Sequence, residues 1–240
     1  MPRFFLPFSP GGTVTVTGED ARHIGLSLRM AVGDPVTFCG PDGTEYQCVI
    51  TAMDRDSVTA AVQQSGPSRA EPSVELRLYQ ALPKGDKMET IIQKAVELGA
   101  REITPVMTRR CVSRPDIRSM EKKLQRYRKI AEEAAKQSGR GRIPRVAPLL
   151  SFEAAVEELA ALPLPLLFYE GGGEALCRLL KEPVPTIGLF VGAEGGFDPE
   201  EVSLAREAGL RAATLGPRIL RCETAPLCAL SAILYATGNL

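Results

Sequence analysis

The chain has 240 residues, of which 44% are apolar, and its 29 basic and 29 acidic side chains give a formal net charge of zero. This length allows two modest domains or one large one, and the apolar content is enough for an ordinary soluble core. No apolar run is long enough to span a membrane, and the N-terminus lacks the plan of a signal peptide. The six cysteines form no CxxC pair and fit a reducing cytosol, and a single histidine, His23, excludes most zinc and Ser-His-Asp sites.

Positive charge is concentrated in one part of the chain. Between Arg101 and Arg145 there are 14 Lys or Arg residues and five acidic residues. A local excess of this kind attracts a polyanion, which favours a nucleic-acid partner. The alternative is a solvated helix face.

Residues 1–64 have the pattern of short β-strands separated by turns. Runs rich in β-formers lie at 13–17, 35–39 and 46–50, with Pro, Gly and Asp between them. This spacing predicts a small barrel. The polar, proline-containing stretch 65–73 is typical of a linker, and we place the domain boundary there.

After the linker, predicted strands alternate with predicted helices, which indicates a parallel sheet with helices on both faces. A helix begins after Asp86 and stops at Gly99, and Asp198-Pro199 is a strong helix start. Apolar residues from Met120 to Ala134 mark one face of a long helix, and the helix over 224–237 is almost wholly apolar, as in a core helix or a subunit interface. The predicted strands are 74–82, 103–107, 164–169, 186–191 and 212–215.

Two glycine-bearing segments lie close together, one from Leu189 to Glu201 and the other from Leu215 to Ala225. Each has the pattern of a strand end, a loop and a helix start, and such loops bind small ligands at the carboxyl ends of parallel strands. The first loop reads GxxGG rather than GxGxxG, no acidic residue in 210–222 is placed to hold a ribose, and a Walker sequence is absent. A lone glycine pair is also typical of a tight turn, but two such loops favour one composite pocket made largely of backbone.

These segments resemble the ribosomal RNA small subunit methyltransferase E family, of the SPOUT class. The matching pieces are Met1–Phe5, His23-Ile24 with Leu28-Arg29, Gly33-Asp34, Lys84–Glu89, Lys94–Gly99, Ala134–Ser138 with Arg140 and Pro144, and both glycine loops. The Leu215–Ala225 segment is the most specific of them. Two places depart from the family pattern: Ala193 stands where Pro is usual, and Arg109–Ser113 differs from the usual Glu-Arg-Ser.

The resemblance implies S-adenosylmethionine-dependent methylation of uridine N3 in 16S rRNA of the small ribosomal subunit. It implies a PUA-like β-barrel over residues 1–68 and, over 74–240, an α/β domain with a parallel SPOUT-type sheet closed by a trefoil knot, which no periodicity reveals. It also implies a cytoplasmic homodimer with no membrane partner and no metal. The expected cofactor-binding residues are Phe168, Tyr169, Glu170, Val191, Gly192, Glu194, Gly195, Gly196, Phe197, Leu215, Gly216, Arg218, Ile219, Leu220, Arg221, Thr224 and Ala225.

For catalysis we expect Arg221 or Arg218 to stabilise negative charge on the uracil, with Glu223 as either a helix-start carboxylate or a catalytic one and water as an alternative proton acceptor. A nucleotide-dependent oxidoreductase and a non-enzymatic RNA-binding module are the two other interpretations. The expected RNA-binding residues are Arg3, His23, Arg29, Lys84, Lys87, Arg109, Arg110, Arg126, Gln137, Arg140 and Arg142.

Overall fold

The computed structural model describes residues 2–240 and divides into two compact units. The first unit runs up to Glu71 and also takes in Ala135–Ile143. The second comprises Pro72–Ala134 and Pro144–Leu240. The first unit is therefore assembled from two stretches that are far apart in the sequence.

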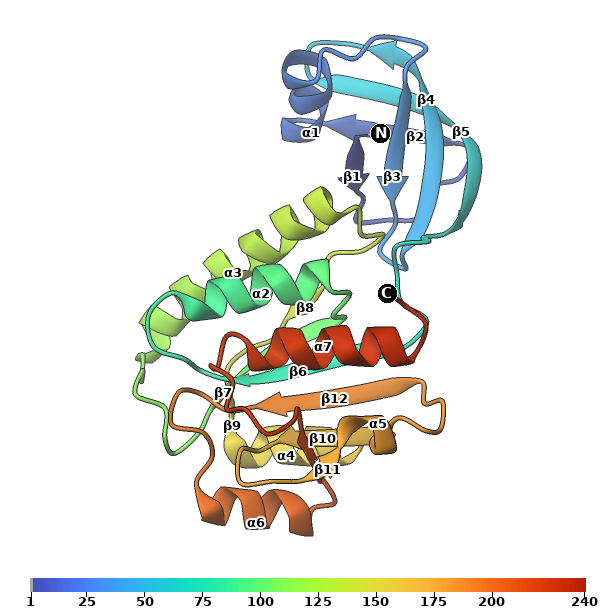
Figure 1. Ribbon diagram of the computed structural model, residues 1–240. Coiled ribbons are helices and arrows are strands. Elements are labelled where there is room, and N and C mark those ends of the chain that lie inside the picture. Colours follow the sequence, from blue (N-terminus) through green and yellow to red (C-terminus); the bar gives the residue numbers. More distant parts are fainter. Residues whose placement is uncertain (1) are drawn as a thin grey trace. The chain divides into compact units, whose positions relative to one another are not determined.

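The first unit is a curled five-stranded sheet (Figure 1). Its order is β1 (Arg3–Phe5), β3 (Pro35–Cys39), β4 (Thr44–Met53), β5 (Ser57–Pro67) and β2 (Thr13–Thr17). Only β1 and β3 run parallel. The predicted small barrel is confirmed as a half-barrel that stays open between β1 and β2. The β5 strand continues to Pro67 and so includes the start of the predicted linker.

Strand alternation builds the core of this unit. In β2 the two valines are buried and the three threonines are exposed, as expected for a strand with one face on the core. Helix α1 (Glu19–Arg22) and the π-helix η1 (His23–Ser27) follow and contribute the buried Ala21 and Ile24. The η1 helix leads to Arg29, which has a left-handed φ of +53° and is the one non-glycine residue in 2–240 with a positive φ.

The second unit contains an eight-stranded sheet in which every pairing is parallel. The strands are β6 (Glu75–Ala81), β7 (Glu102–Met107), β8 (Arg145–Val146), β9 (Leu150–Ser151), β10 (Leu164–Phe168), β11 (Glu174–Ala175), β12 (Thr186–Val191) and β13 (Arg211–Thr214). The order across the sheet is β11-β13-β10-β12-β6-β7-β8, with β9 also on β7. All five strands predicted in this region are present.

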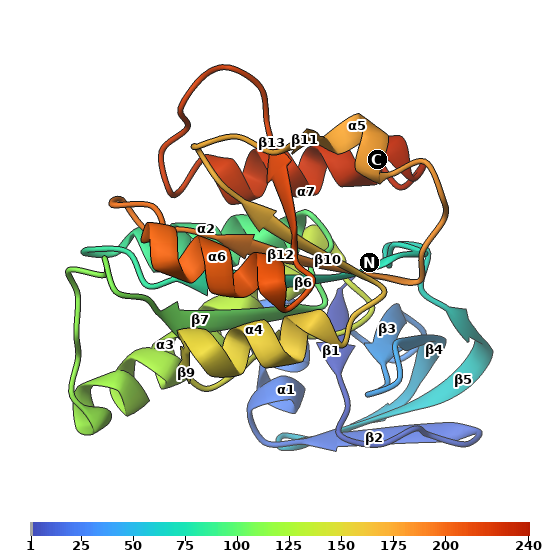
Figure 2. The same cartoon turned by 90° about the horizontal axis from the view of Figure 1, so that it is seen from below.

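Helices cover both faces of this sheet. On one face α2 (Lys87–Glu97) packs with α7 (Ala225–Ala236), and α7 also contacts β6 and β12 (Figure 1). On the other face α4 (Phe152–Ala160) and α6 (Pro199–Glu207) share a core with β10 and β12 (Figure 2). The short α5 (Leu176–Leu179) follows β11. The α/β class with a parallel sheet is confirmed, whereas the trefoil knot stays a prediction.

The long helix α3 (Ile117–Ser138) buries the predicted apolar residues from Met120 to Ala134, and its final residues belong to the first unit. The predicted start of α6 is present as a capping box. The side chain of Asp198 accepts a hydrogen bond from the backbone N–H of Glu200, and the side chain of Glu201 accepts one from the backbone N–H of Asp198. No helix within residues 2–240 combines the length and the apolar character needed to cross a bilayer.

Candidate active site

The second unit contains a cavity of about 490 Å³ beyond the carboxyl ends of β13, β10 and β12, three neighbouring strands of the sheet. Its walls come from Phe168–Glu170 after β10, Val191–Gly196 after β12 and Ala213–Glu223 after β13, with Ala225 at the start of α7 and Lys87 at the start of α2. Parallel strands bring their carboxyl ends to one edge of a sheet, so three chain segments converge there.

The loop after β12 folds back sharply on itself. The backbone N–H of Gly196 donates to the carbonyl of Ala193 over 3.0 Å, and Gly196 has a φ of +63°. A Cβ on Gly196 would clash with the carboxylate of Glu170. The positive φ favours glycine at this position, and any side chain there would have to displace the carboxylate of Glu170.

The loop after β13 carries an exposed tip. Arg218, Ile219 and Arg221 are exposed, and Ile219 keeps 85% of its accessible surface. The loop then turns into α7, where the N–H of Ala225 donates to the Arg221 carbonyl over 2.9 Å. The tip thus presents two cationic side chains and one apolar side chain at the rim of the cavity.

A charged cluster joins these loops. The ammonium of Lys87 lies 2.8 Å from Oε1 of Glu194 and 3.5 Å from Oε2 of Glu223. The hydrogen bond from Lys87 to Glu194 raises the pKa of the lysine. Burial alone would raise the pKa of Glu194, but the bond from Lys87 holds it below its usual value. Both groups are therefore charged at neutral pH.

Glu223 belongs to the same cluster. Its pKa is lowered by its own backbone N–H and by the thiol of Cys222, whose Sγ lies 3.2 Å from Oε2. Burial and this hydrogen bond raise the pKa of Cys222 to about 12. Cys222 is thus a neutral thiol that donates to the carboxylate.

Arg109 and Arg110 lie behind the loop after β12. Arg110 donates to the carbonyl of Gly195 over 3.1 Å and pairs with Asp198, while Arg109 pairs with Glu200 and Asp198. Glu201, which is 1% exposed, accepts the backbone N–H of Arg109 over 2.8 Å. These two predicted RNA ligands therefore also hold the loop against the start of α6.

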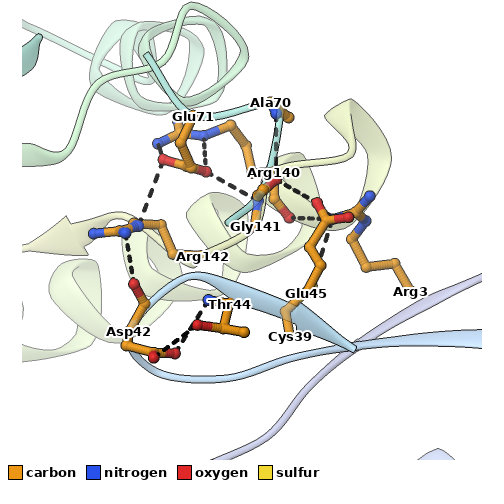
Figure 3. Close-up of polar contacts among 11 residues, drawn as sticks. Arg3, Cys39, Asp42, Thr44, Glu45, Ala70, Glu71, Arg140, Gly141 and Arg142 are labelled. Carbon is orange, nitrogen blue, oxygen red and sulfur yellow. Dashed lines mark hydrogen bonds and ion pairs between the residues drawn. The ribbon is translucent and has the colours of Figure 1, made fainter. Parts of the chain in front are cut away.

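Three predicted RNA ligands lie in one polar network of the first unit (Figure 3). Arg140 is 2% exposed and pairs with Glu71 at 2.7 Å. Arg142 donates to the carbonyl of Asp42 over 2.7 Å, and Arg3 pairs with Glu45. Buried charge needs a partner of this kind, so Arg140 holds the stretch 135–143 to the rest of its unit.

The other predicted RNA ligands are more exposed. His23 is exposed and meets Phe4 edge-on, with ring centroids 5.9 Å apart. Arg126 is 65% exposed and pairs with Glu89. Arg29, Lys84 and Gln137 are also exposed.

Most predicted cofactor residues line the cavity, but two do not. Phe197 is 1% exposed and packs on Phe190 with centroids 4.8 Å apart, and Thr224 lies outside the lining. The three predicted catalytic residues, Arg218, Arg221 and Glu223, do line it. Ala193, Pro217 and Cys222 also line the cavity and lie within the loops predicted to form it, whereas Ala213 and Thr214 precede the second loop and Lys87 was predicted to bind RNA. Contiguity with the predicted loops was the available signal for all of these except Lys87.

Comparison with known families defines the class of protein. The family model for the RNA methyltransferase domain matches residues 70–234, and that for the RNA methyltransferase PUA domain matches residues 16–63. A Bacillus subtilis protein named ribosomal RNA small subunit methyltransferase E is 36% identical, over 99% of this chain and 97% of its own length. The class is therefore that of RNA methyltransferases with a PUA domain.

Two solved structures agree with this assignment. The Neisseria gonorrhoeae ribosomal RNA small subunit methyltransferase E, bound to S-adenosyl methionine, is 32% identical with a TM-score of 0.87, covering 98% of this chain and 97% of that one. A putative methyltransferase of Legionella pneumophila, in complex with the cofactor SAM, is 32% identical with a TM-score of 0.82 and the same coverage. The chain belongs to the ribosomal RNA small subunit methyltransferase E family.

Proposed function

We propose that this protein methylates N3 of a uridine in the 16S rRNA of the small ribosomal subunit, in the cytoplasm, with S-adenosylmethionine as the methyl donor. The observation that carries the proposal is the cavity formed by the two glycine loops, in a chain whose relatives along nearly its full length are rRNA methyltransferases. Its walls are mostly backbone and apolar side chains, with a few polar groups that fix orientation, as in a small-molecule site.

The residues present fit S-adenosylmethionine. Val191, Leu215 and Leu220 offer apolar surface to an adenine ring. Glu170 lines the cavity and makes no hydrogen bond or ion pair with any residue in 2–240, so its carboxylate is free to accept the ribose hydroxyls. Carboxylates also favour the positive sulfonium.

When bound, S-adenosylmethionine supplies an electrophilic methyl group on a sulfur that departs as a neutral thioether. The chain's own residues must orient an unpaired uracil and manage the proton that leaves N3. We assign to Arg221, with Arg218 beside it, the stabilisation of negative charge on the uracil oxygens. Glu223 lines the cavity, but its lowered pKa makes it a weak base, so the N3 proton passes to this carboxylate or to water.

In this proposal each unit by itself offers exposed cationic side chains to RNA. In the first unit Arg29 follows the π-helix, and π-helical turns and left-handed non-glycine residues are frequent at functional sites. In the second unit the exposed Lys84 lies beside the loop after β12.

We also propose that the protein is a homodimer that buries the outer face of α7. Cys228, Tyr235 and Ala236 are exposed on this helix, and Tyr235 keeps 78% of its accessible surface. Sedimentation velocity should give twice the monomer mass of 25.9 kDa. Tyr235→Glu should shift the protein to monomer, because a charge in an apolar interface lacks a partner, whereas Leu204→Glu on α6 should leave the dimer intact. A monomeric unaltered protein would contradict the proposal.

The decisive experiment is transfer of labelled methyl from S-adenosylmethionine to purified small subunits that lack the modification, followed by identification of the nucleoside. We expect N3-methyluridine. Label in another nucleoside would overturn the N3 assignment, and no transfer to free 16S rRNA or to subunits would overturn the function.

Thermal unfolding separates the other interpretations. S-adenosylhomocysteine should raise the melting temperature and NAD should not, since only a ligand that binds the folded state stabilises it. Protection by NAD alone would indicate an oxidoreductase, and protection by neither would indicate a non-enzymatic RNA-binding module.

A further inference from the structure

Lys87 occupies an unusual position for a lysine. It is the first residue of α2, where the N-terminal end of the helix dipole disfavours a positive charge. A cation there weakens the helix unless acidic groups compensate for it. The ammonium of Lys87 has two such groups, Glu194 at 2.8 Å and Glu223 at 3.5 Å, and both come from other segments.

The three members of this cluster come from three different segments that line the cavity. Lys87 follows β6, Glu194 lies in the loop after β12, and Glu223 ends the loop after β13. The carboxylate of Glu194 also accepts the backbone N–H of Lys84, with both oxygens within 3.3 Å. One ammonium group therefore connects the β6–α2 turn to both walls of the cavity.

We propose that Lys87 is a positioning residue that holds the two glycine loops together through Glu194 and Glu223, and that it is not a phosphate ligand. The inference rests on the proposed function, since it assigns the loops to S-adenosylmethionine. It replaces the sequence-based expectation that Lys87 binds RNA.

The electrostatic environment of Lys87 supports this role. The side chains of Lys87, Glu194 and Glu223 are only about a third exposed, at 33%, 33% and 28%. A phosphate approaching this ammonium would meet two carboxylates already beside it. Arg218 and Arg221, by contrast, are exposed on the loop tip and make no hydrogen bond or ion pair with side chains of the described chain, so they suit phosphate or base contacts better.

Removal of the ammonium has a specific consequence. Glu194 and Glu223 would face each other without a counter-charge, and like charges repel. The loop after β12 and the loop after β13 would then separate, which would loosen the cavity without disturbing the first unit. Cofactor affinity should therefore fall while RNA affinity is unchanged.

The experiment compares Lys87→Met, Lys87→Arg and the matched control Lys94→Met. Lys94 lies on the same helix and pairs with Glu97 at 2.9 Å, away from the cavity lining. By titration calorimetry, Lys87→Met should weaken S-adenosylhomocysteine binding about tenfold, the size expected for coupled neighbouring groups. Lys87→Arg should recover most of the affinity, and Lys94→Met should bind as the unaltered protein does.

A double-mutant cycle with Glu194→Gln tests the coupling. If Lys87 acts through Glu194, the double variant should bind S-adenosylhomocysteine more tightly than the two single losses predict, because the repulsion disappears with the second charge. Additive losses would overturn the role through Glu194. The cycle is read from binding affinities, so a lowered melting temperature in one variant is not evidence for or against the coupling.

RNA binding provides the opposing outcome. Lys87→Met should leave the affinity for 16S rRNA and its salt dependence unchanged. Unaltered S-adenosylhomocysteine affinity together with a salt slope reduced by about 0.7 would identify Lys87 as a phosphate ligand and overturn the inference. If the unaltered protein itself binds no S-adenosylhomocysteine, the proposed function fails as well, so the two failures are distinguishable.

Discussion

At the scale of single residues, the arginines of the loop after β13 differ from those behind the loop after β12. Arg109 and Arg110 are held by Asp198, Glu200 and a backbone carbonyl. Arg218 and Arg221 stand exposed at the rim of the cavity. A guanidinium already paired with carboxylates is neutralised, so the rim arginines are the ones available for charge that develops on a substrate.

Arg221→Ala should therefore lower turnover by about 10²–10³-fold, the usual loss when one donor to a developing oxyanion is removed. S-adenosylhomocysteine affinity should be unchanged, because the side chain is not needed for the loop backbone. Single-turnover kinetics and calorimetry measure the two effects. Arg206→Ala on α6 is the control, and full turnover by Arg221→Ala would contradict the assignment.

The cysteines provide a test of the charged cluster. The pKa of Cys222 is raised to about 12 by burial and by its bond to Glu223, so its thiolate becomes abundant only near that pH. At pH 8, alkylation of Cys222 should be slower than that of the exposed Cys177 by on the order of a thousandfold. Mass spectrometry of iodoacetamide-treated protein gives the ratio, and denaturant should abolish the difference. Equal native rates would mean that the cluster is not formed.

At the scale of secondary-structure elements, the loop after β12 depends on one glycine. Gly196→Ala would place a side chain at a φ of +63° and against Glu170. The left-handed backbone alone costs about 1–2 kcal/mol of stability. We expect this loss in unfolding experiments and, in addition, loss of S-adenosylhomocysteine binding.

Gly238→Ala is the matched control for this glycine. Gly238 has a similar φ of +70°, but a Cβ added there would meet nothing within 4 Å, so it shares the backbone strain without the clash. It should lose comparable stability and keep cofactor affinity. Equal affinity in both variants would show that the loop tolerates a side chain.

Much of the element pattern was predictable because local signals mark it. The β2 strand follows from its alternation, β3 from a short run rich in β-formers between turn residues, and the start of α6 from its capping box. The α4 helix was missed, although Ser151 caps it by accepting the N–H of Ala154. The two-residue strands β8, β9 and β11 carry too few residues for any propensity and exist only because their neighbours pair with them.

The loops of the candidate site were predictable from the sequence, but the contacts that join them to distant residues were not. These loops are contiguous stretches of sequence, so a pattern finds most of their residues at once. The bond between Lys87 and Glu194 joins residues 107 positions apart, and no local pattern encodes such a contact. The burial of Arg140 against Glu71 is a second contact of this kind, 69 positions apart.

At the scale of the whole molecule, zero net charge conceals a local positive excess between residues 101 and 145. RNA affinity should fall as salt rises. The logarithm of the binding constant should decrease with the logarithm of the salt concentration, with a slope near 0.7 for each phosphate contacted on single-stranded RNA. Arg29→Gln should reduce the slope by about one contact, whereas Arg178→Gln on α5 should not. Filter binding at several salt concentrations measures this, and a salt-independent affinity would exclude the proposed RNA surface.

The parallel sheet also determines when the protein becomes functional during its own synthesis. The central strand β6 pairs with β12, which emerges about 110 residues later, or roughly 5–20 s at ordinary elongation rates. Until then Leu76, Leu78 and Tyr79 lack that neighbouring strand and must be shielded in another way. The first unit also waits, because Glu71 meets Arg140 only after the long helix has emerged. A nascent chain released early would therefore expose apolar strand surface in the second unit and lack the Glu71–Arg140 ion pair in the first, and cofactor can stabilise the protein only after translation is nearly complete.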